Sequence, residues 1–298
     1  MRKILLSSIM LLTAILAQGQ TKIAPTLKKG MVKTYQTTAE YQIPGQSKIT
    51  TTTDETLTVA DVTEKGCVIN YVSSNFKSDA AEGDIAGQIL TAAGSLMSGV
   101  TIVIDTDKDG KAQHIANFAE LQKLLDKKSD EMADKLLAAV PAAAGALPKE
   151  NVKAMIMEGL SEDKLLKSFQ DKESPLALNG KTLTTGTEEV FTNEKGMKMK
   201  RLYFVMGKTI TCNAVLDMTQ EEMKALIIAM IEKNMPDQAE MVKQNIDQLI
   251  ASGMLKLDMQ ENASYQLADD GWMKSIKVEE TANTMGQKTV VNTTVTLK

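Results

Sequence analysis

Runs of alternating apolar and polar residues dominate the first part of the chain. Residues 31–77 contain three such runs, rich in Thr, Val, Ile and Tyr, and turns at Pro44-Gly45 and Gly66 separate them. Alternation at every second position places one side of a strand against a core, whereas Gly and Pro mark the turns between strands. The pattern therefore predicts a meander of three strands.

The period then changes to that of helices. Apolar residues recur three or four positions apart in four segments, which are residues 83–98, 117–137, 148–159 and 161–170. This spacing gives a helix one apolar stripe. Asn117 followed by Glu120 has the spacing of a capping box at the start of the second segment. Between the first two segments, residues 100–104 and 111–115 are predicted to pair as a hairpin.

The second half of the chain repeats the order of strands, helices and strands. Strand character returns at Lys181, and Thr219 opens a helix with a Thr-Gln-Glu-Glu capping box. The remaining predicted elements are two strands in residues 198–218, a second helix from Pro236, and strands at 254–267, 272–281 and 289–297. The sequence shows no strand-helix-strand alternation, which would indicate a parallel sheet.

These elements predict an α+β fold, in which a curved antiparallel β-sheet, half-barrel-like, packs against several amphipathic α-helices. The helices need such a sheet because their apolar stripes have no other surface to cover. Residues 20–298 are expected to form a single α+β domain. Two similar subdomains, at about 20–180 and 181–298, are the alternative.

Residues 1–19 follow the pattern of a secretory signal peptide. Arg2 and Lys3 precede an apolar run over residues 4–17, and Ala17 and Gly19 supply small side chains before a cleavage point after Gly19. A run of about 14 residues is shorter than the roughly 20 that a membrane-spanning helix needs. We expect an exported protein, periplasmic or extracellular, that is soluble and has no integral membrane span after cleavage.

Charge argues against a nucleic-acid partner. The chain has 34 Lys and Arg against 38 Asp and Glu. Without Arg2 and Lys3 the count becomes 32 against 38, a net charge of −6 for residues 20–298. Proteins that bind nucleic acid present a basic surface, which this composition does not favour.

Catalytic and cofactor motifs are absent from the sequence. His114 is the only histidine, which excludes a multi-histidine zinc site, and there is no Gly-x-Ser-x-Gly motif. We therefore predict a non-enzymatic protein without a cofactor and name no catalytic residues.

One segment partly matches a calcium-binding loop. Asp105, Asp107 and Asp109 occupy positions 1, 3 and 5, and Gly110 occupies position 6, but position 12 is Ala116 in place of a bidentate Glu. Asp and Gly are also the residues that a hairpin turn requires. The turn is the preferred interpretation, and calcium is the alternative.

Cys67 and Cys212 are the only cysteines, and each lies on the apolar side of a predicted strand. An oxidising compartment would permit a disulfide between them. Two buried free thiols that pack as small apolar groups are the other interpretation, and the preferred one.

Methionine is unusually frequent, with nineteen in the chain. Met suits irregular packing and surfaces that accept varied apolar partners. Filling of the core is the simpler explanation, and thioether capture of copper is a third. If an apolar pocket exists, its predicted lining is Met132, Met155, Met223, Leu226 and Met230.

Three stretches carry a family resemblance: Leu27-Lys28-Lys29-Gly30, the strand Leu57-Thr58-Val59, and the Asp-Gly hairpin followed by Asn117-Phe118-Ala119-Glu120-Leu121. The chain resembles uncharacterised secreted proteins of Bacteroidetes, a domain of unknown function. Its plan of strands and helices also resembles periplasmic lipoprotein carriers, whose sheet wraps helices around an apolar cavity. The first resemblance implies only the compartment and the class of the protein. Export, amphipathic helices, soft methionine side chains and the absence of catalytic motifs together predict an envelope protein that binds a lipid or a hydrophobic peptide. An interaction or scaffold protein with a filled core and a protein-binding surface is the alternative.

Overall fold

The computed structural model describes residues 20–81, 84–139, 148–193, 196–234, 236–251, 257–284 and 287–298. Its helices are α2 (Ile85–Leu96), α3 (Phe118–Ala139), α5 (Lys149–Gly159), α6 (Glu162–Gln170), α7 (Gln220–Asn234) and α8 (Pro236–Ala251). The predicted leader, residues 1–19, lies outside the described residues. Within them, no helix is both long enough and apolar enough to cross a membrane.

The strands hold more of the described residues than the helices do. They are β1 (Thr21–Lys22), β2 (Val32–Gln42), β3 (Ile49–Val62), β4 (Cys67–Ser78), β5 (Thr101–Thr106), β6 (Ala112–Ile115), β7 (Thr182–Leu183), β8 (Glu188–Thr192), β9 (Lys198–Met206), β10 (Thr209–Leu216), β11 (Leu257–Leu267), β12 (Met273–Thr284) and β13 (Gln287–Leu297). These bounds confirm the predicted meander, the predicted hairpin and the three predicted C-terminal strands.

Eleven of the described strands form one sheet with the order β6-β5-β4-β3-β2-β13-β12-β11-β10-β9-β8, and β1 pairs with β7 separately. The sheet is antiparallel and open, because β6 and β8 end the described order without pairing to each other. The α+β class is thus confirmed. Closure into a half-barrel is not part of this topology.

The chain divides into two compact units. The N-terminal unit comprises Ile23–Lys181, Tyr265–Val278 and Val291–Lys298. The C-terminal unit comprises Thr182–Ser264 and Glu279–Val290, together with β1. The sequence-based division assigned all of residues 181–298 to one subdomain. The structure instead gives two of the C-terminal segments to the N-terminal unit.

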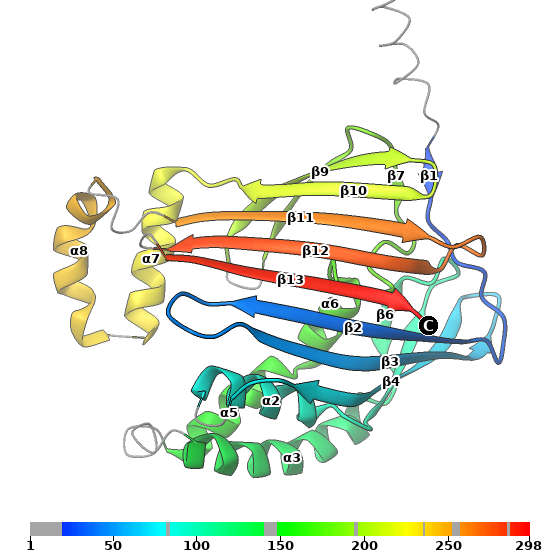
Figure 1. Ribbon diagram of the computed structural model, residues 1–298, viewed down its shortest axis with the longest axis horizontal. Helices are drawn as coiled ribbons and strands as arrows, with labels where there is room; N and C mark the ends of the chain where they lie inside the picture. Colours follow the sequence, from blue (N-terminus) through cyan, green and yellow to red (C-terminus); the bar gives the residue numbers. More distant parts are fainter. Residues whose placement is uncertain are drawn as a thin grey trace, which may run out of the picture. The chain divides into compact units, whose positions relative to one another are not determined.

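In the N-terminal unit, the alternation of β2 and β3 explains which side chains are buried. Tyr35 and Leu57 point to the same side of the sheet and are fully buried. Helices α2, α3 and α5 lie next to one another, and α2 also contacts β4 (Figure 1). Helix α6 contacts β6, where the Glu162 carboxylate pairs with His114 Nδ1 at 2.6 Å.

The start of α3 corrects a detail of the sequence prediction. The Asn117 side chain does not cap the helix, because its Oδ1 accepts from Val103 N at 2.9 Å and its Nδ2 donates to Thr101 O at 3.0 Å. Asn117 therefore fastens the start of α3 to β5. A single sequence could not distinguish the two roles, since the amide serves either backbone equally well.

In the C-terminal unit, the predicted capping box of α7 is confirmed. Thr219 N donates to the Glu222 carboxylate at 2.8 Å, and Glu222 N donates to Thr219 Oγ1 at 3.2 Å. Helices α7 and α8 contact each other (Figure 1). Met197, Met199, Ala214 and Met259 form a buried cluster in this unit, and Leu226 of α7 packs against it.

Candidate functional site

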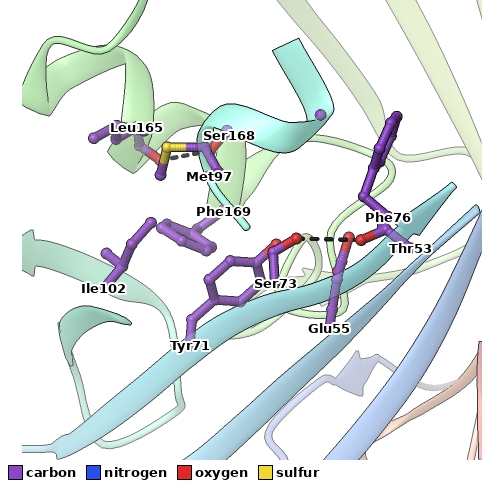
Figure 2. A pocket seen from close by; sticks show the side chains of 11 residues that line it. Thr53, Glu55, Tyr71, Ser73, Phe76, Met97, Ile102, Leu165, Ser168 and Phe169 are labelled. Carbon is purple, nitrogen blue, oxygen red and sulfur yellow. Dashed lines mark hydrogen bonds between the residues drawn. The ribbon is translucent and has the colours of Figure 1, made fainter. Parts of the chain in front are cut away.

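A pocket of about 240 Å³ lies within the N-terminal unit, between strands β3, β4 and β5 and helices α2 and α6 (Figure 2). Eleven residues line it: Thr53, Glu55, Tyr71, Ser73, Phe76, Gly94, Met97, Ile102, Leu165, Ser168 and Phe169. Aromatic, aliphatic and thioether side chains form most of its wall. The polar groups of β3 and β4 gather at one end, on Thr53, Glu55 and Ser73.

A bulge in β4 lies next to one wall of the pocket. The pairing of β3 with β4 shifts register between Thr52 and Asp54, and Asn75 opposite the shift has a φ of +53°. An extra residue in one strand bends it and redirects the neighbouring side chains. Asn75 Nδ2 donates to Asp54 Oδ2 at 2.9 Å and so holds the bulge. Phe76 follows directly and lines the pocket.

Gly94 lets α2 approach the Phe76 ring closely. A Cβ atom at Gly94 would lie 2.1 Å from Phe76 Cε2, which is closer than carbon atoms approach one another. Gly in a helix interior costs up to about 1 kcal/mol relative to Ala. The close approach explains the glycine at position 94, because any side chain there would keep α2 away from the Phe76 ring.

Helix α2 is anchored at its C-terminal end. Lys128 Nζ, from α3, donates to Leu96 O at 2.8 Å and to Ser98 O at 3.2 Å. Gly99 N donates to Ser73 O at 2.7 Å. A cation at a helix C-terminus binds its free carbonyl groups and interacts favourably with the helix dipole. These contacts fix the α2 side of the pocket to α3 and to β4.

Glu55 places a carboxyl group in the pocket. Tyr35 of β2 and Ser73 of β4 lie directly opposite it on the neighbouring strands. Thr37 Oγ1 donates to Glu55 Oε1 at 3.2 Å. Desolvation by burial raises the pKa of Glu55 to about 7, the Thr37 hydrogen bond lowers it, and the negative charge of Glu173 raises it further. The carboxyl group therefore titrates near neutral pH.

Two tyrosines flank Glu55. Burial raises the pKa of Tyr71, and the charge of Glu55 adds to the effect. The Tyr71 ring meets the Phe169 ring edge to face, with 5.0 Å between centroids (Figure 2). Tyr35 is fully buried, and its hydroxyl group has no hydrogen-bond partner within the described residues. Both phenols stay neutral at physiological pH.

Two serines of the pocket lining take part in hydrogen bonds. Ser168 Oγ donates to Leu165 O at 2.7 Å, and Ser73 Oγ shares a hydrogen bond of 3.2 Å with Thr53 Oγ1 (Figure 2). In the described chain, neither serine of the pocket has a histidine or lysine within the lining to act as its base. Lysine and arginine are likewise absent from these eleven residues.

The predicted apolar-pocket residues do not line this pocket. Met132 is buried in α3, whereas Met155 of α5 is 67% exposed and points to solvent. Met223 is half-buried, and Leu226 packs against the methionine cluster of the C-terminal unit. The side chain of Met230 lies outside the described residues. The prediction failed for Met155 because α5 buries none of its residues, and apolar spacing alone does not show whether another element covers a helix.

The calcium interpretation of the hairpin is wrong. Asp107 Oδ1 accepts from the backbone N–H groups of Asp109 and Lys111 at 2.9 and 3.0 Å. These bonds close the turn, as Asp side chains commonly do. Asp105 belongs to β5 and is paired with His114. No three His, Cys, Asp or Glu residues converge on a metal-sized site in the described chain.

Cys67 and Cys212 are both free and buried. They belong to different units. Cys67 Sγ lies 2.9 Å from Thr106 Oγ1, and burial raises the pKa of this thiol. A raised pKa keeps a thiol protonated and unreactive. The two cysteines are thus the buried free thiols of the preferred interpretation.

Glu55 is the site residue that the sequence reasoning missed. Ile49, Leu57 and Val59 are buried at odd-numbered positions of β3, and Glu55 continues the same side of the strand. A charged residue that continues the apolar side of a strand is the signal that could have identified it. The pocket itself could not be predicted, because its walls come from β3, β4, β5, α2 and α6.

Comparison with known proteins leaves the family open. No family model and no curated protein matches the chain. The chain is similar to a solved structure described as lipid–protein interactions in lipovitellin, at 10% identity and a TM-score of 0.36, and this match covers 92% of the chain but only 25% of lipovitellin. The chain thus spans about a quarter of that protein.

Two further similar structures match the chain over most of their length. One is Rv2717c from M. tuberculosis, at 7% identity and a TM-score of 0.24, and the match covers 89% of this chain and 91% of Rv2717c. The other is the S-type phycobiliprotein lyase CPES from Guillardia theta, at 8% identity and a TM-score of 0.21, and the match covers 89% of this chain and 86% of the lyase. TM-scores this low establish neither a shared ligand nor a shared activity.

Proposed function

We propose that this chain is a non-enzymatic binding protein of the cell envelope, and that it holds a compact apolar molecule in the pocket of the N-terminal unit. The observation that supports the proposal is a pocket with a largely apolar wall between the strands and helices of this unit. The export signal predicted for residues 1–19 and the resemblance to secreted Bacteroidetes proteins support the location.

The volume of the pocket restricts the ligand. Pockets for drug-sized molecules measure about 300–1,000 Å³, and an apolar cavity of about 150 Å³ binds benzene. At about 240 Å³ the pocket accommodates an aromatic ring with a short side chain, or the end of an acyl chain. A whole lipid exceeds this space, which narrows the ligand class suggested by the sequence to small molecules and chain ends.

A titration with 2-phenylethanol tests the proposal, because this molecule is neutral, aromatic and small enough for the pocket. We expect saturable binding by calorimetry, together with NMR shifts at residues around Phe76 and Phe169. Protein purified from its own envelope should also carry a compact apolar ligand in native mass spectrometry. Absence of saturable binding to 2-phenylethanol would contradict the proposed function.

An interaction protein is the second candidate, and one surface of the C-terminal unit favours it. Phe204 and Met206 of β9 are 46% and 74% exposed. On the same side of the sheet, Lys200 is flanked by Val190 of β8 and Val215 of β10, and both valines are exposed. Exposed apolar side chains that gather on one surface are typical of protein-binding sites.

A photo-crosslinking residue at position 206 tests this second candidate in the native envelope, with position 208 in the adjacent turn as the matched control. A partner crosslinked from position 206 but not from position 208 would favour the interaction protein. Equal crosslinking from both positions, or none from either, would contradict it.

A further inference from the structure

We infer that the ligand of the pocket is a compact apolar molecule with a positively charged amino group, and that Glu55 is the residue that binds this group. The inference rests on the proposed function, since it specifies the chemistry of the same pocket. It follows from the distribution of polar groups around the pocket, which differs sharply between its two ends.

The polar end of the pocket offers hydrogen-bond acceptors and a negative charge. The Glu55 carboxylate accepts one long hydrogen bond, from Thr37 at 3.2 Å, although a carboxylate has about four acceptor positions. The hydroxyl oxygens of Thr53 and Ser73 stand beside it on β3 and β4, and a hydroxyl oxygen can also accept. Figure 2 shows Glu55, Tyr71 and Ser73 projecting from the same side of the sheet.

The charges around Glu55 exclude an anionic ligand group. Glu173, held by Thr293 at 2.9 Å, adds a second negative charge near Glu55. Tyr35 of β2 and Tyr71 of β4 are neutral, and the lining residues of α2 and α6 carry no charge. Lys33, further along β2, is bound to Asp270 at 2.6 Å. A ligand carboxylate or phosphate would therefore meet repulsion without a cation to offset it.

The apolar end of the pocket selects the rest of the ligand. Met97, Ile102, Leu165 and Phe169 lie together at this end (Figure 2), and none of their side chains carries a hydrogen-bonding N–H or O–H group. A primary ammonium group has three donors, which match the acceptors of Glu55, Thr53 and Ser73. A hydrocarbon body of one ring or a short chain then occupies the apolar end. A charge that enters such a site needs a partner of opposite sign, which Glu55 supplies.

Three probes of the same size distinguish the ligand classes: 2-phenylethylamine, 2-phenylethanol and phenylacetate. At pH 8 we expect the amine to bind at least about tenfold more tightly than the alcohol, and phenylacetate to bind more weakly than either. Glu55→Gln should remove the preference, so that the amine and the alcohol bind with about equal affinity. Glu40→Gln, which removes a carboxylate from the opposite side of the sheet, should change none of the three.

The wild-type protein provides a second test that needs no variant. The amine keeps its proton across the range, because amines have pKa values near 10. Between pH 8 and pH 5.5 Glu55 takes up a proton. The affinity for the amine, at least about tenfold higher than that for the alcohol at pH 8, should therefore become about equal to it at pH 5.5. Circular dichroism at both pH values checks that the fold is retained.

The outcomes separate the two proposals. Binding of the alcohol without any preference for the amine would overturn this inference but leave the proposed function in place. A preference for the amine that survives Glu55→Gln would also overturn it. If none of the three probes binds, the proposed function fails and the inference fails with it.

Discussion

The two units differ in the side chains that surround a buried charge. In the C-terminal unit, Met197, Met199 and Met259 fill the interior, and the buried Arg201 pairs with Glu261 at 2.7 Å. In the N-terminal unit, stiff aromatic side chains stand between sheet and helices, and Glu55 faces a pocket without a cation. Flexible thioethers close irregular gaps, whereas rigid rings leave them open. Among the described residues, a pocket and a carboxyl group without a cation in the pocket lining occur together in the N-terminal unit.

The largest expected effect comes from breaking the buried ion pair of the C-terminal unit. Glu261→Gln leaves Arg201 buried beside a neutral group and should lower the free energy of unfolding by about 3–5 kcal/mol. Glu189 at 3.6 Å from Arg201, and Phe191 beneath its guanidinium group, keep the loss toward the lower end of that range. Urea denaturation followed by circular dichroism measures it.

The exposed pair of Lys200 with Glu188 is the control for this experiment, because Glu188→Gln should cost at most about 1 kcal/mol. Replacing both buried partners, with Arg201→Met and Glu261→Leu together, should recover most of the lost stability. If Glu261→Gln alone lowers the free energy of unfolding by less than 1 kcal/mol, the buried ion pair does not distinguish the C-terminal unit from the N-terminal unit.

The second expected effect is a dependence of stability on pH that originates from Glu55. Folding raises the pKa of Glu55 from 4.5 to about 7, so the folded chain holds this proton more tightly than the unfolded chain does. The resulting stabilisation is fully present below about pH 4.5 and is lost as the pH rises through 7. Glu55→Gln should therefore match the wild type at low pH and exceed it at pH 8, by on the order of 3 kcal/mol.

Urea denaturation of the wild type and of Glu55→Gln at pH 4.5, 6, 7 and 8 measures this difference. Glu40→Gln serves as the control for a general change in charge. Parallel stability curves for the wild type and Glu55→Gln would mean that Glu55 is solvated as it is in the unfolded chain.

A third, smaller effect concerns the close approach of α2 to the sheet. Gly94→Ala places a methyl group into the Phe76 ring and should destabilise the protein by about 1–3 kcal/mol. In a Phe76→Ala background the clash disappears, and the same substitution should stabilise by up to about 1 kcal/mol through helix propensity. Gly159→Ala in α5, where the methyl group meets no atom within 4 Å, is the control. If Gly94→Ala changes the stability in the same direction with Phe76 present and with Phe76→Ala, the close packing of Gly94 against the Phe76 ring is contradicted.

The smallest expected effect tests the anchoring of α2. Lys128→Met removes two hydrogen bonds to the C-terminal carbonyl groups of α2 and should cost about 0.5–1 kcal/mol. Amide hydrogen exchange should accelerate in α2 and much less in β4. The neighbouring exposed Lys127→Met is the control, and equal exchange in the two variants would contradict the anchoring role.

The sequence predicted the elements far better than the site. Alternation in β2, β3 and β4 and the stripes of α3, α5 and α6 are local patterns, and the Thr219 capping box is readable within four residues. The pocket depends on long-range contacts, such as that between Phe76 and Gly94. The prediction that Met132 and Met155 line one pocket failed because apolar spacing does not reveal which elements cover a helix. Met132 of α3 is buried, whereas α5 buries none of its residues. The calcium hypothesis failed because Asp107 serves the turn.

The central claim is that the pocket of the N-terminal unit binds a compact apolar molecule. Ser168 lies on the exposed side of α6 at the pocket, so Ser168→Trp introduces a large ring there while leaving the core intact. The neighbouring Lys167→Trp places the same ring outside the lining. Calorimetric titration with 2-phenylethanol should show equal affinity for the wild type and Lys167→Trp. The affinity of Ser168→Trp should be at least about tenfold lower. Equal affinity in all three proteins would contradict the assignment of this pocket as the binding site.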